Sequence, residues 1–418
     1  MSNSENYGVS VKDFGAKGDG LADEAGAFQA ALDSGAPLIV IPFGAYRVSK
    51  TLRIGSNTRL KAHNNAIISL AGGVCVNPGD FLLTNKNKDA GDVNITVEGG
   101  TWNYNNAGNP RGHSLFDQTG PTGRMIDFHN VKNLTLSGMT LQNPECYYIC
   151  LCKVENFLVE NISFETTCLT GNQDGVHVAG FCKNGVIRNL HASPYSPNDD
   201  FIALNADDII SRQEATGKLC GPIENLVISN IEAKECHSFI RINSIDSAVR
   251  NIEIDHVRGG VRCFVLNMDA ARYCRTPMFK DEDFPGGVGK AENIRLSNVK
   301  ACVTKPGKCL FCLETKVKNF TVRNFEYDYE NAGTPFVNTA FIGNISDEKV
   351  SVTGLTEEQA RLLQKESRCA NIRTRPLSDS SRNGLTQVSA CVDSGETLVI
   401  PPGGFDLLEI NKDRYFDY

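Results

Sequence analysis

One short phrase recurs along this chain, and it limits the possible folds more than any other feature. The phrase begins with Asn, continues with alternating apolar residues and often contains a second Asn. Copies of it read NITVEGGTW from Asn94, NLTLSGMTL from Asn133, NFLVENISF from Asn156, NGVIRNLHA from Asn184, NLVISNIEA from Asn225, NIEIDHVRG from Asn251, NIRLSNVKA from Asn293 and NFTVRNFEY from Asn319. Such a repeat is typical of a solenoid, in which every coil adds the same structural unit.

The spacing of these copies predicts coils of one basic length, with extra segments inserted into some of them. Asn133 and Asn156 are about 23 residues apart and Asn225 and Asn251 about 26, while three intervals are longer by about 15. Each copy alternates like a strand buried on one side, and no single coil can bury its apolar side chains alone. The sequence therefore predicts an all-β parallel β-helix with a rise of about 4.8 Å per coil, in which the Asn side chains hydrogen-bond as a ladder.

The two ends of a solenoid expose strand edges, so covering elements are expected there. Residues 22–34 predict a helix that places Leu21, Ala25, Phe28, Ala31 and Leu32 on one side, against the first coil. Residues 356–368, TEEQARLLQKESR, begin with a capping-box pattern and predict a second short helix. We therefore expect a β-helix with its N-terminal cap over residues 8–345. A small C-terminal cap or appendage should follow over 346–418, as a candidate oligomer contact.

Charge and hydropathy exclude several kinds of partner. The formal net charge of the 418 residues is -7 and no Lys/Arg run is present, which argues against nucleic-acid binding. No segment approaches the roughly 18 apolar residues of a membrane span, and the first residues lack the pattern of an export signal. We therefore expect no membrane contact and a cytoplasmic location, with a secreted mature form left open.

The cysteine pattern favours buried, reduced thiols over a metal site. The chain has 15 cysteines with irregular spacing. Cys146, Cys150 and Cys152 lie close together in CYYICLC, but this segment alternates like a strand and has no companion CxxC at zinc-ligand spacing. The sequence predicts neither a metal nor a cofactor.

Charged residues recur at similar positions on four consecutive coils. Counted from each ladder Asn, Asp174 lies about 18 residues on, Asp199 and Asp200 about 15, His237 about 12 and Arg262 about 11. Stacked coils would bring these side chains into one column. Carboxylates that lie so close raise at least one pKa, so that one group can donate a proton while another activates water. A pair of this kind is the equipment for glycoside hydrolysis.

The first coil and this column both carry a family resemblance. The segments VKDFGAKGDGLADEAGAFQAALDSG and LIVIPFGAYRV resemble the N-terminal cap and first coil of the pectate-lyase-like superfamily, whose members fold as right-handed parallel β-helices. The site resembles glycoside hydrolase family 28, the polygalacturonases, whose motifs are NTD, GDD, GHG and RIK. Here NQD ends at Asp174, NDD ends at Asp200, CHS surrounds His237, and GGVRCF contains Arg262.

The resemblance implies roles for these residues. Asp200 would be the general acid, Asp174 and Asp199 would position and deprotonate water in one inverting step, and His237 would tune the acid. Arg262 would bind an anionic or hydroxyl-rich sugar. The Lys of the family falls on Phe264, which weakens the case for galacturonate, although Arg241 is placed to compensate.

Further substrate contacts are expected around the column. Asn172 belongs to the NQD motif, and His177 follows Asp174 closely enough to line the same cleft. The inserted segments supply Tyr195 and Arg272, which could contact sugars by stacking and by charge. These inserts would form walls around an oligosaccharide.

The expected function is hydrolysis of a glycosidic bond in a pectin-like or other acidic oligo- or polysaccharide. One alternative is a polysaccharide lyase that uses the Asp pair with Asp207 and Asp208 to bind calcium. A sugar epimerase or a non-catalytic glycan-binding β-helix could also use this architecture, because fold does not decide function.

The orientation of Asp200 is a specific test of the site. Strict alternation would place Asp200 on the core face with Ile202 and Leu204, where an unpaired carboxylate would be costly. We therefore expect the chain to bend at Asn198–Asp199, so that both Asp199 and Asp200 reach the cleft.

Overall fold

The computed structural model describes most of the chain up to Val303 and selected strands beyond it. The described residues are 8–111, 120–207, 218–268, 289–304, 309–313, 317–328, 330–331, 338–342, 371–376, 386–391 and 397–399. Side chains are described within these ranges as far as Thr304, and again at 328, 330 and 331.

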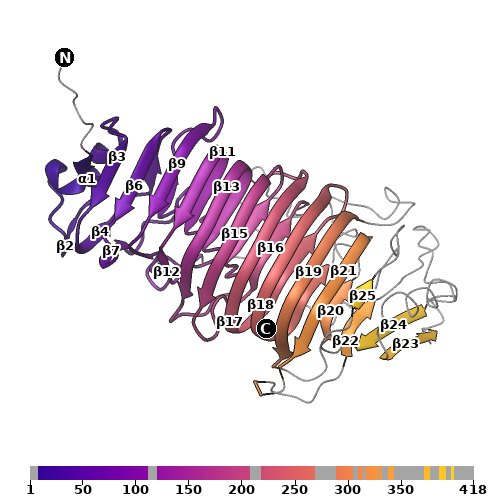
Figure 1. Ribbon diagram of the computed structural model, residues 1–418. Helices are drawn as coiled ribbons and strands as arrows, with labels where there is room; N and C mark the ends of the chain where they lie inside the picture. Colours follow the sequence, from indigo (N-terminus) through magenta and orange to yellow (C-terminus); the bar gives the residue numbers. More distant parts are fainter. Residues whose placement is uncertain are drawn as a thin grey trace.

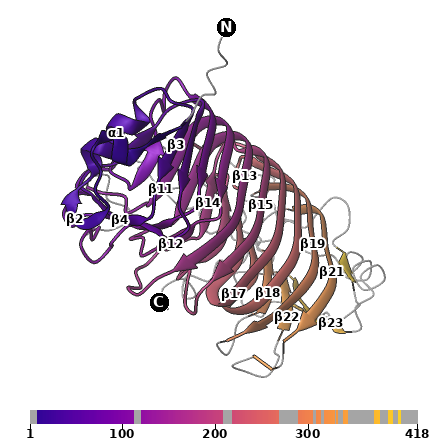
Figure 2. The same cartoon turned by 60° about the vertical axis from the view of Figure 1, so that its left-hand side comes forward.

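The strands stack into an elongated parallel β-helix with one row of strands on each of three faces (Figures 1 and 2). The first row, which carries the Asn phrases, runs through β1 (Val9–Ser10), β3 (Leu38–Ile41), β6 (Thr58–Ala62), β9 (Asp92–Glu98), β11 (Ile126–Ser137), β13 (Ile149–Glu165), β15 (Lys183–Ala192), β17 (Ile223–Asn243), β18 (Ala248–Met268), β19 (Lys290–Val303) and β21 (Val317–Tyr327). The predicted all-β parallel solenoid is confirmed.

The other two rows share the long strands and add short ones. The second row contains β2 (Asp19–Asp23), β4 (Gly44–Val48), β7 (Ala66–Leu70), β10 (Thr101–Asn103) and β12 (Thr140–Gln142), and then the later parts of β13, β15, β17, β18 and β19. The third row contains β5 (Leu52–Ile54), β8 (Leu83–Asn85), the starts of β11 and β13, β14 (Val176–Ala179), β16 (Asp200–Asn205), the ends of β17 and β18, β20 (Cys309–Leu313) and β22 (Asn338–Ile342).

Inward side chains from all three rows form one continuous apolar core. Aromatic rings contact one another along it: Phe164 meets Phe201 edge to face with ring centroids 5.4 Å apart, and Phe201 stacks on Phe239 with centroids 6.3 Å apart. Burial of such large apolar surfaces is the main stabilising contribution to a repeat fold of this kind.

The predicted asparagine ladder is present along the first row, with Asn57 just before β6 and the later members inside the first-row strands. Side-chain amides donate to the carbonyl oxygen of the Asn on the preceding coil at 2.7–3.3 Å, along the series Asn57, Asn94, Asn133, Asn156, Asn184, Asn225, Asn251 and Asn293. All of them have φ between 56° and 62°, the left-handed conformation that Asn tolerates better than other residues with a Cβ. The side chain of Asn319 lies outside the described residues.

A second column on the first row is charged. The residues Lys132, Glu155, Lys183, Glu224, Arg250 and Glu292 are register partners on successive coils, and we call them the charge ladder. Their signs alternate at every step. Three of the steps are ion pairs, at 3.7 Å, 3.6 Å and 2.5 Å.

The N-terminal helix is shorter than predicted and uses fewer side chains. Helix α1 spans Ala25–Leu32, after a 3-10 turn η1 at Val11–Phe14, and it lies at the N-terminal end of the solenoid (Figure 1). Phe28 is fully buried and its ring meets Tyr46 edge to face at 5.2 Å. The expectation for Leu21 is wrong: it lies in β2 and is 83% exposed, because the chain enters the helix only at Ala25.

The described strands near the C-terminus change direction. Strands β23 (Asn371–Pro376), β24 (Thr386–Cys391) and β25 (Thr397–Val399) pair antiparallel, β24 with β22 and β25 with β21. The predicted helix at 356–368 lies outside the described residues. Within the described ranges no helix is long and apolar enough to span a membrane.

The described cysteines agree with the expectation of buried thiols. Ten are free thiols, and eight of these ten are buried. Cys146 and Cys150 pack with Tyr147 in a small cluster beside the main core.

Candidate active site

The third row brings the predicted acidic residues together on neighbouring coils. Val176 of β14 pairs with Ile202 of β16, and Gly175 donates its backbone N–H to the carbonyl of Asp200 at 3.0 Å, so Asp174 stands beside Asp200. Asp200 is in turn the register partner of Ser238 in β17. Asp174, Asp199 and Asp200, which we call the carboxylate column, are each at least 93% buried.

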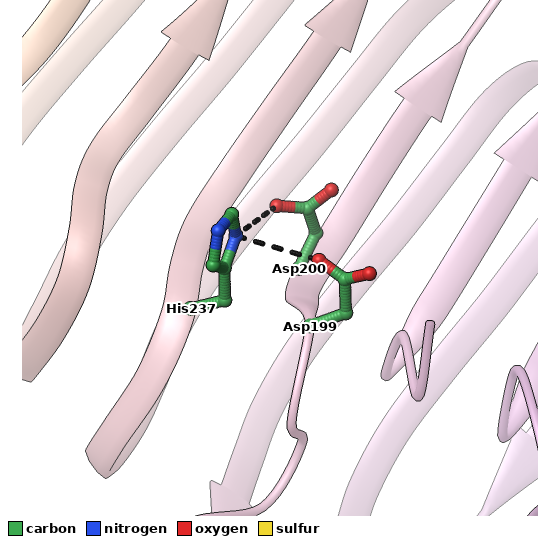
Figure 3. Close-up of side chains that lie close together, drawn as sticks. All are labelled: Asp199, Asp200 and His237. Carbon is green, nitrogen blue, oxygen red and sulfur yellow. Dashed lines mark ion pairs between the residues drawn. The ribbon is translucent and has the colours of Figure 1, made fainter. Parts of the chain in front are cut away.

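Asp199 and Asp200 both approach the same imidazole nitrogen (Figure 3). His237 Nδ1 lies 3.4 Å from Asp199 Oδ1 and 3.6 Å from Asp200 Oδ1. The expected bend is present: residues 197–199 form a bend, and β16 begins at Asp200. Phe201 and Ile202 follow in sequence and both belong to the core, so strict alternation does not hold here and Asp200 need not point inward.

Each carboxylate of the pair has a separate polar neighbour. Asn172 donates its side-chain amide to Asp199 Oδ2 at 3.1 Å, and Asn172 itself has φ 62°. Arg241 Nη1 lies 3.9 Å from Asp200 Oδ2. Arg241 follows His177 and Ala203 in the register of the third row, so its guanidinium reaches Asp200 from the next coil.

The protonation of the column is asymmetric. Burial and then the charge of Asp200 raise the pKa of Asp199 to about 6. Burial also opposes ionisation of Asp200, but the close approach of His237 and the charge of Arg241 outweigh it, and the pKa of Asp200 is lowered. Asp199 therefore keeps its proton to higher pH than Asp200.

The other two titratable groups of the site are shifted upwards. Burial, together with the charges of Asp199 and Asp200, raises the pKa of Asp174 well above its usual range. Burial lowers the pKa of His237, but contacts with Asp200, Cys263 and Asp199 outweigh this and raise it well above its usual range. His237 is thus a cation that favours an ionised Asp200 beside it.

Asp174 has a close partner on its own coil. Its Oδ2 is 2.7 Å from Nδ1 of His177, which is fully buried. The imidazole of His177 stacks on Tyr147, with ring centroids 3.9 Å apart and ring planes 10° apart. Of the predicted substrate contacts, His177 is thus the one that touches the carboxylate column directly and has no exposed surface.

The remaining predicted contacts lie at different depths. Arg262 donates to Asn198, to its side-chain oxygen at 2.9 Å and also to its backbone oxygen, and it pairs with Glu235 at 3.3 Å. The Arg262 side chain therefore braces the residue that precedes Asp199. Tyr195 is 57% exposed, and Arg272 lies outside the described residues. Phe264, the register partner of Ser238, is buried.

A buried ionic cluster beside the column was not expected from the sequence. Asp127 contacts Arg124 at 2.5 Å and Lys88 at 2.5 Å, and burial, which raises its pKa, is outweighed by these two cations. Arg124 also donates to Cys150 Sγ at 3.4 Å. Cys150 is the third-row register partner of His177, 27 residues earlier in the chain, and Asp127 is the partner of Cys150, another 23 residues earlier. Counting coils back from His177 could therefore have found both.

The acidic pair and His237 also have the composition of a metal site. Asp199, Asp200 and His237 place one ligand atom each within 4.8 Å of one another, the one such group in the part of the chain that the structure describes. However, the Asn172 amide and the Arg241 guanidinium are directed at these two carboxylates, and donors there compete with a cation. The arrangement fits proton transfer better than metal binding.

Asp207, a predicted calcium ligand in the lyase alternative, instead accepts hydrogen bonds from the backbone of a turn. Its Oδ2 accepts backbone N–H groups from residues 245, 246 and 247, each at 2.7 Å. Asp207 is buried and holds a turn of the next coil. Asp208 lies outside the described residues.

Comparison with known proteins identifies the family. Residues 8–262 match the family described as rhamnogalacturonase A/epimerase, pectate lyase-like. The chain belongs to this family. This agrees with the polygalacturonase-like resemblance of the site motifs.

Two relatives of this pectate lyase-like chain have very different names. The polygalacturonase of Persea americana is 24% identical over 306 residues, which cover 70% of this chain and 58% of the plant protein. The pre-neck appendage protein of Bacillus phage phi29 is 39% identical over 102 residues, which cover 24% of this chain and 12% of the phage protein. The chain thus spans less than two thirds of either relative.

Solved structures agree with the pectate lyase-like fold. The family 28 exopolygalacturonase of Yersinia enterocolitica superimposes with a TM-score of 0.55 at 18% identity, covering 79% of this chain and 68% of that chain. At this identity the likeness concerns the fold alone.

Proposed function

We propose that the chain is a glycoside hydrolase that cleaves a bond in a pectin-like or other acidic oligo- or polysaccharide, with inversion at the anomeric carbon. The observation that carries this proposal is the pair of adjacent carboxyls on His237, one with a raised pKa and one with a lowered pKa, beside Asp174. Two carboxyl groups whose environments separate their proton affinities are what acid and base catalysis of glycoside hydrolysis needs.

The protonation pattern favours Asp199 as the proton donor. This reverses the roles that the family resemblance had suggested for Asp199 and Asp200. In the proposed step, water attacks the anomeric carbon while the bond to the leaving oxygen breaks. Asp199 gives its proton to that oxygen, and Asp200 takes a proton from the water. Asp174 orients the water, and the His237 cation keeps Asp200 ionised until the step begins.

The charge around the column suits an acidic sugar. Arg241 contacts Asp200 and its side chain is 17% exposed, so its guanidinium has a surface that a substrate carboxylate could meet. Tyr195 offers an exposed ring for stacking. Phe264 provides no charge where family 28 has Lys, so Arg241 would take over recognition of the carboxylate.

Product analysis tests the proposal. The chain would be incubated with polygalacturonate, rhamnogalacturonan and neutral control glycans, and new reducing ends would be counted. We expect release from an acidic glycan, and proton NMR of the first product should show the inverted anomer. Retention of configuration would overturn the single-step mechanism, and no release from any glycan would overturn the hydrolase.

The similarity to a phage appendage protein supports one second candidate, a β-helix that binds glycans without cleaving them. It predicts saturable glycan binding with no new reducing ends. The same incubations separate two further reactions. An ultraviolet-absorbing product that a chelator abolishes would indicate a lyase, and a product of unchanged length with altered stereochemistry would indicate an epimerase.

A further inference from the structure

The contact between Asp174 and His177 differs from every other contact of the carboxylate column described above. It is the shortest of them, at 2.7 Å between Oδ2 and Nδ1, and His177 is fully buried. One face of its ring is covered by Tyr147 at 3.9 Å. A group enclosed in this way cannot bind a sugar directly, so any effect of His177 on the reaction must pass through Asp174.

The charges around His177 come from several strands and work in opposite directions. Asp174, with Asp199 and Asp200 behind it, favours a positive imidazole. On the other side Lys218, which is 2% exposed, donates to the Tyr147 hydroxyl at 3.1 Å, and its ammonium lies 5.0 Å from the Tyr147 ring centroid.

The neighbouring coils add further charges. Arg124, paired with Asp127, contacts Cys150, which is the register partner of His177. Arg241 lies two coils further along the same row. Together with Lys218, these cations oppose a full second proton on the imidazole, while the 2.7 Å contact with Asp174 is short enough for the two side chains to share one proton.

We propose that His177 is the positioning residue for Asp174, and that the two side chains share one proton and act as a unit without net charge beside Asp199 and Asp200. The catalytic role of His177 rests on the proposed function, whereas the shared proton does not. His177 fixes one carboxyl oxygen of Asp174, which leaves the other oxygen to meet water. Because the pair is neutral, Asp174 can take part without adding a second negative charge beside Asp200.

The shared proton can be tested without any substrate. The chain has seven histidines, and ring-nitrogen NMR of the labelled protein follows each of them with pH. We expect Asp174→Asn to lower the titration midpoint of His177 by about one pH unit or more, because the negative partner is lost. The exposed His191, paired only loosely with Glu232 at 3.8 Å, is the internal control and should not move. An unchanged midpoint for His177 would overturn the pairing.

Kinetics test the positioning role. We expect His177→Ala to lower kcat by about 10- to 100-fold with KM within about twofold, and to change the pH profile of kcat. His177→Asn should recover part of the loss, since its amide can still donate to Asp174. His191→Asn is the matched control. A wild-type kcat and pH profile in His177→Ala would overturn the role. If the wild-type chain cleaves no glycan, the proposed function fails, while the NMR result still decides the pairing.

Discussion

The charge ladder and the carboxylate column are built by the same stacking and have opposite electrostatics. In the charge ladder each coil places a side chain of opposite sign over the one before, from Lys132 to Glu292, at the surface. In the carboxylate column Asp174 and the pair Asp199–Asp200 place three acids on two neighbouring coils, almost fully buried.

The difference shows how one scaffold can hold both compensated charges at its surface and a buried group of acids with separated pKa values. Opposite charges that are exposed to water attract one another only weakly, because the solvent screens them. Each pair of the charge ladder therefore contributes little to stability. Like charges out of water cannot all ionise, and the pKa of Asp199 rises to about 6 while that of Asp200 falls. The backbone repeat is the same in both columns, but the side chains alternate in sign in the charge ladder and are all acidic in the carboxylate column.

The largest expected effect comes from removing the proposed proton donor of the column. Asp199→Asn keeps the shape of the side chain but has no proton to give, so hydrolysis should fall by about 10³-fold or more. Initial rates of reducing-sugar release measure this, and calorimetric titration should show that glycan binding is kept. A variant that retains more than a tenth of the rate would exclude Asp199 as the donor.

The buried cluster at Asp127 sharpens the comparison, because it is compensated like the charge ladder but lies inside. Asp127→Asn would remove the carboxylate that faces Arg124 and Lys88, and the free energy of unfolding should fall by about 3–5 kcal/mol. Urea unfolding followed by circular dichroism gives this value. Asp246→Asn, which breaks the exposed pair with Lys290, is the control and should cost under about 1 kcal/mol. Equal losses in the two variants would show that burial does not matter here.

The pH dependence follows from the asymmetry of Asp199 and Asp200. In the proposed step Asp199 gives up a proton, and since its pKa is raised to about 6, kcat/KM should fall about tenfold per pH unit above that value. Asp200 must be ionised, and because its pKa is lowered, the acidic limb should lie below the ordinary range of an Asp.

Carboxyl NMR provides the matching measurement on the protein alone. In Asp200→Asn the negative neighbour is gone, so the Asp199 midpoint should move to lower pH. If it stays in place, like-charge repulsion is not what holds the proton on Asp199.

The smallest effect is expected in the charge ladder. Lys183→Glu would place three acids in succession, with Glu155 and Glu224, and should lower the free energy of unfolding by about 0.5–1 kcal/mol. Added salt should reduce the difference, whereas Lys183→Gln should be nearly neutral. A salt-independent loss would point to packing in place of charge.

The repeat made most of the fold predictable. A strand phrase that begins with Asn at each coil fixes the first-row register, and counting on from the ladder places a neighbour on the third row to within a few residues. This is why Asp174, Asp199, Asp200 and His237 could be placed on one row from the sequence alone. The N-terminal helix was less predictable: Leu21 fits a helical stripe, but the chain keeps it in an exposed strand, since tertiary pairing with β4 outweighs local periodicity.

Contacts made by residues in the segments between strands could not be predicted by counting from the ladder. The contact of Asn172 with Asp199 and that of Arg262 with Asn198 depend on how the chain turns between strands, where the spacing is irregular. The sequence also could not show which of the two carboxyls, Asp199 or Asp200, has the higher pKa. The difference in pKa depends on which carboxyl receives His237 and Arg241, and this follows from side-chain geometry that no periodicity encodes.

The asparagine ladder has a consequence for how such a chain can diversify. Its hydrogen bond is 3.2 Å across an interval of 23 residues between Asn133 and Asn156, and 2.9 Å across 42 residues between Asn251 and Asn293. The hydrogen bond between two ladder residues therefore forms whether the segment between them is short or long. During evolution the segments between two ladder residues can therefore change in length or sequence, while the spacing between coils stays the same.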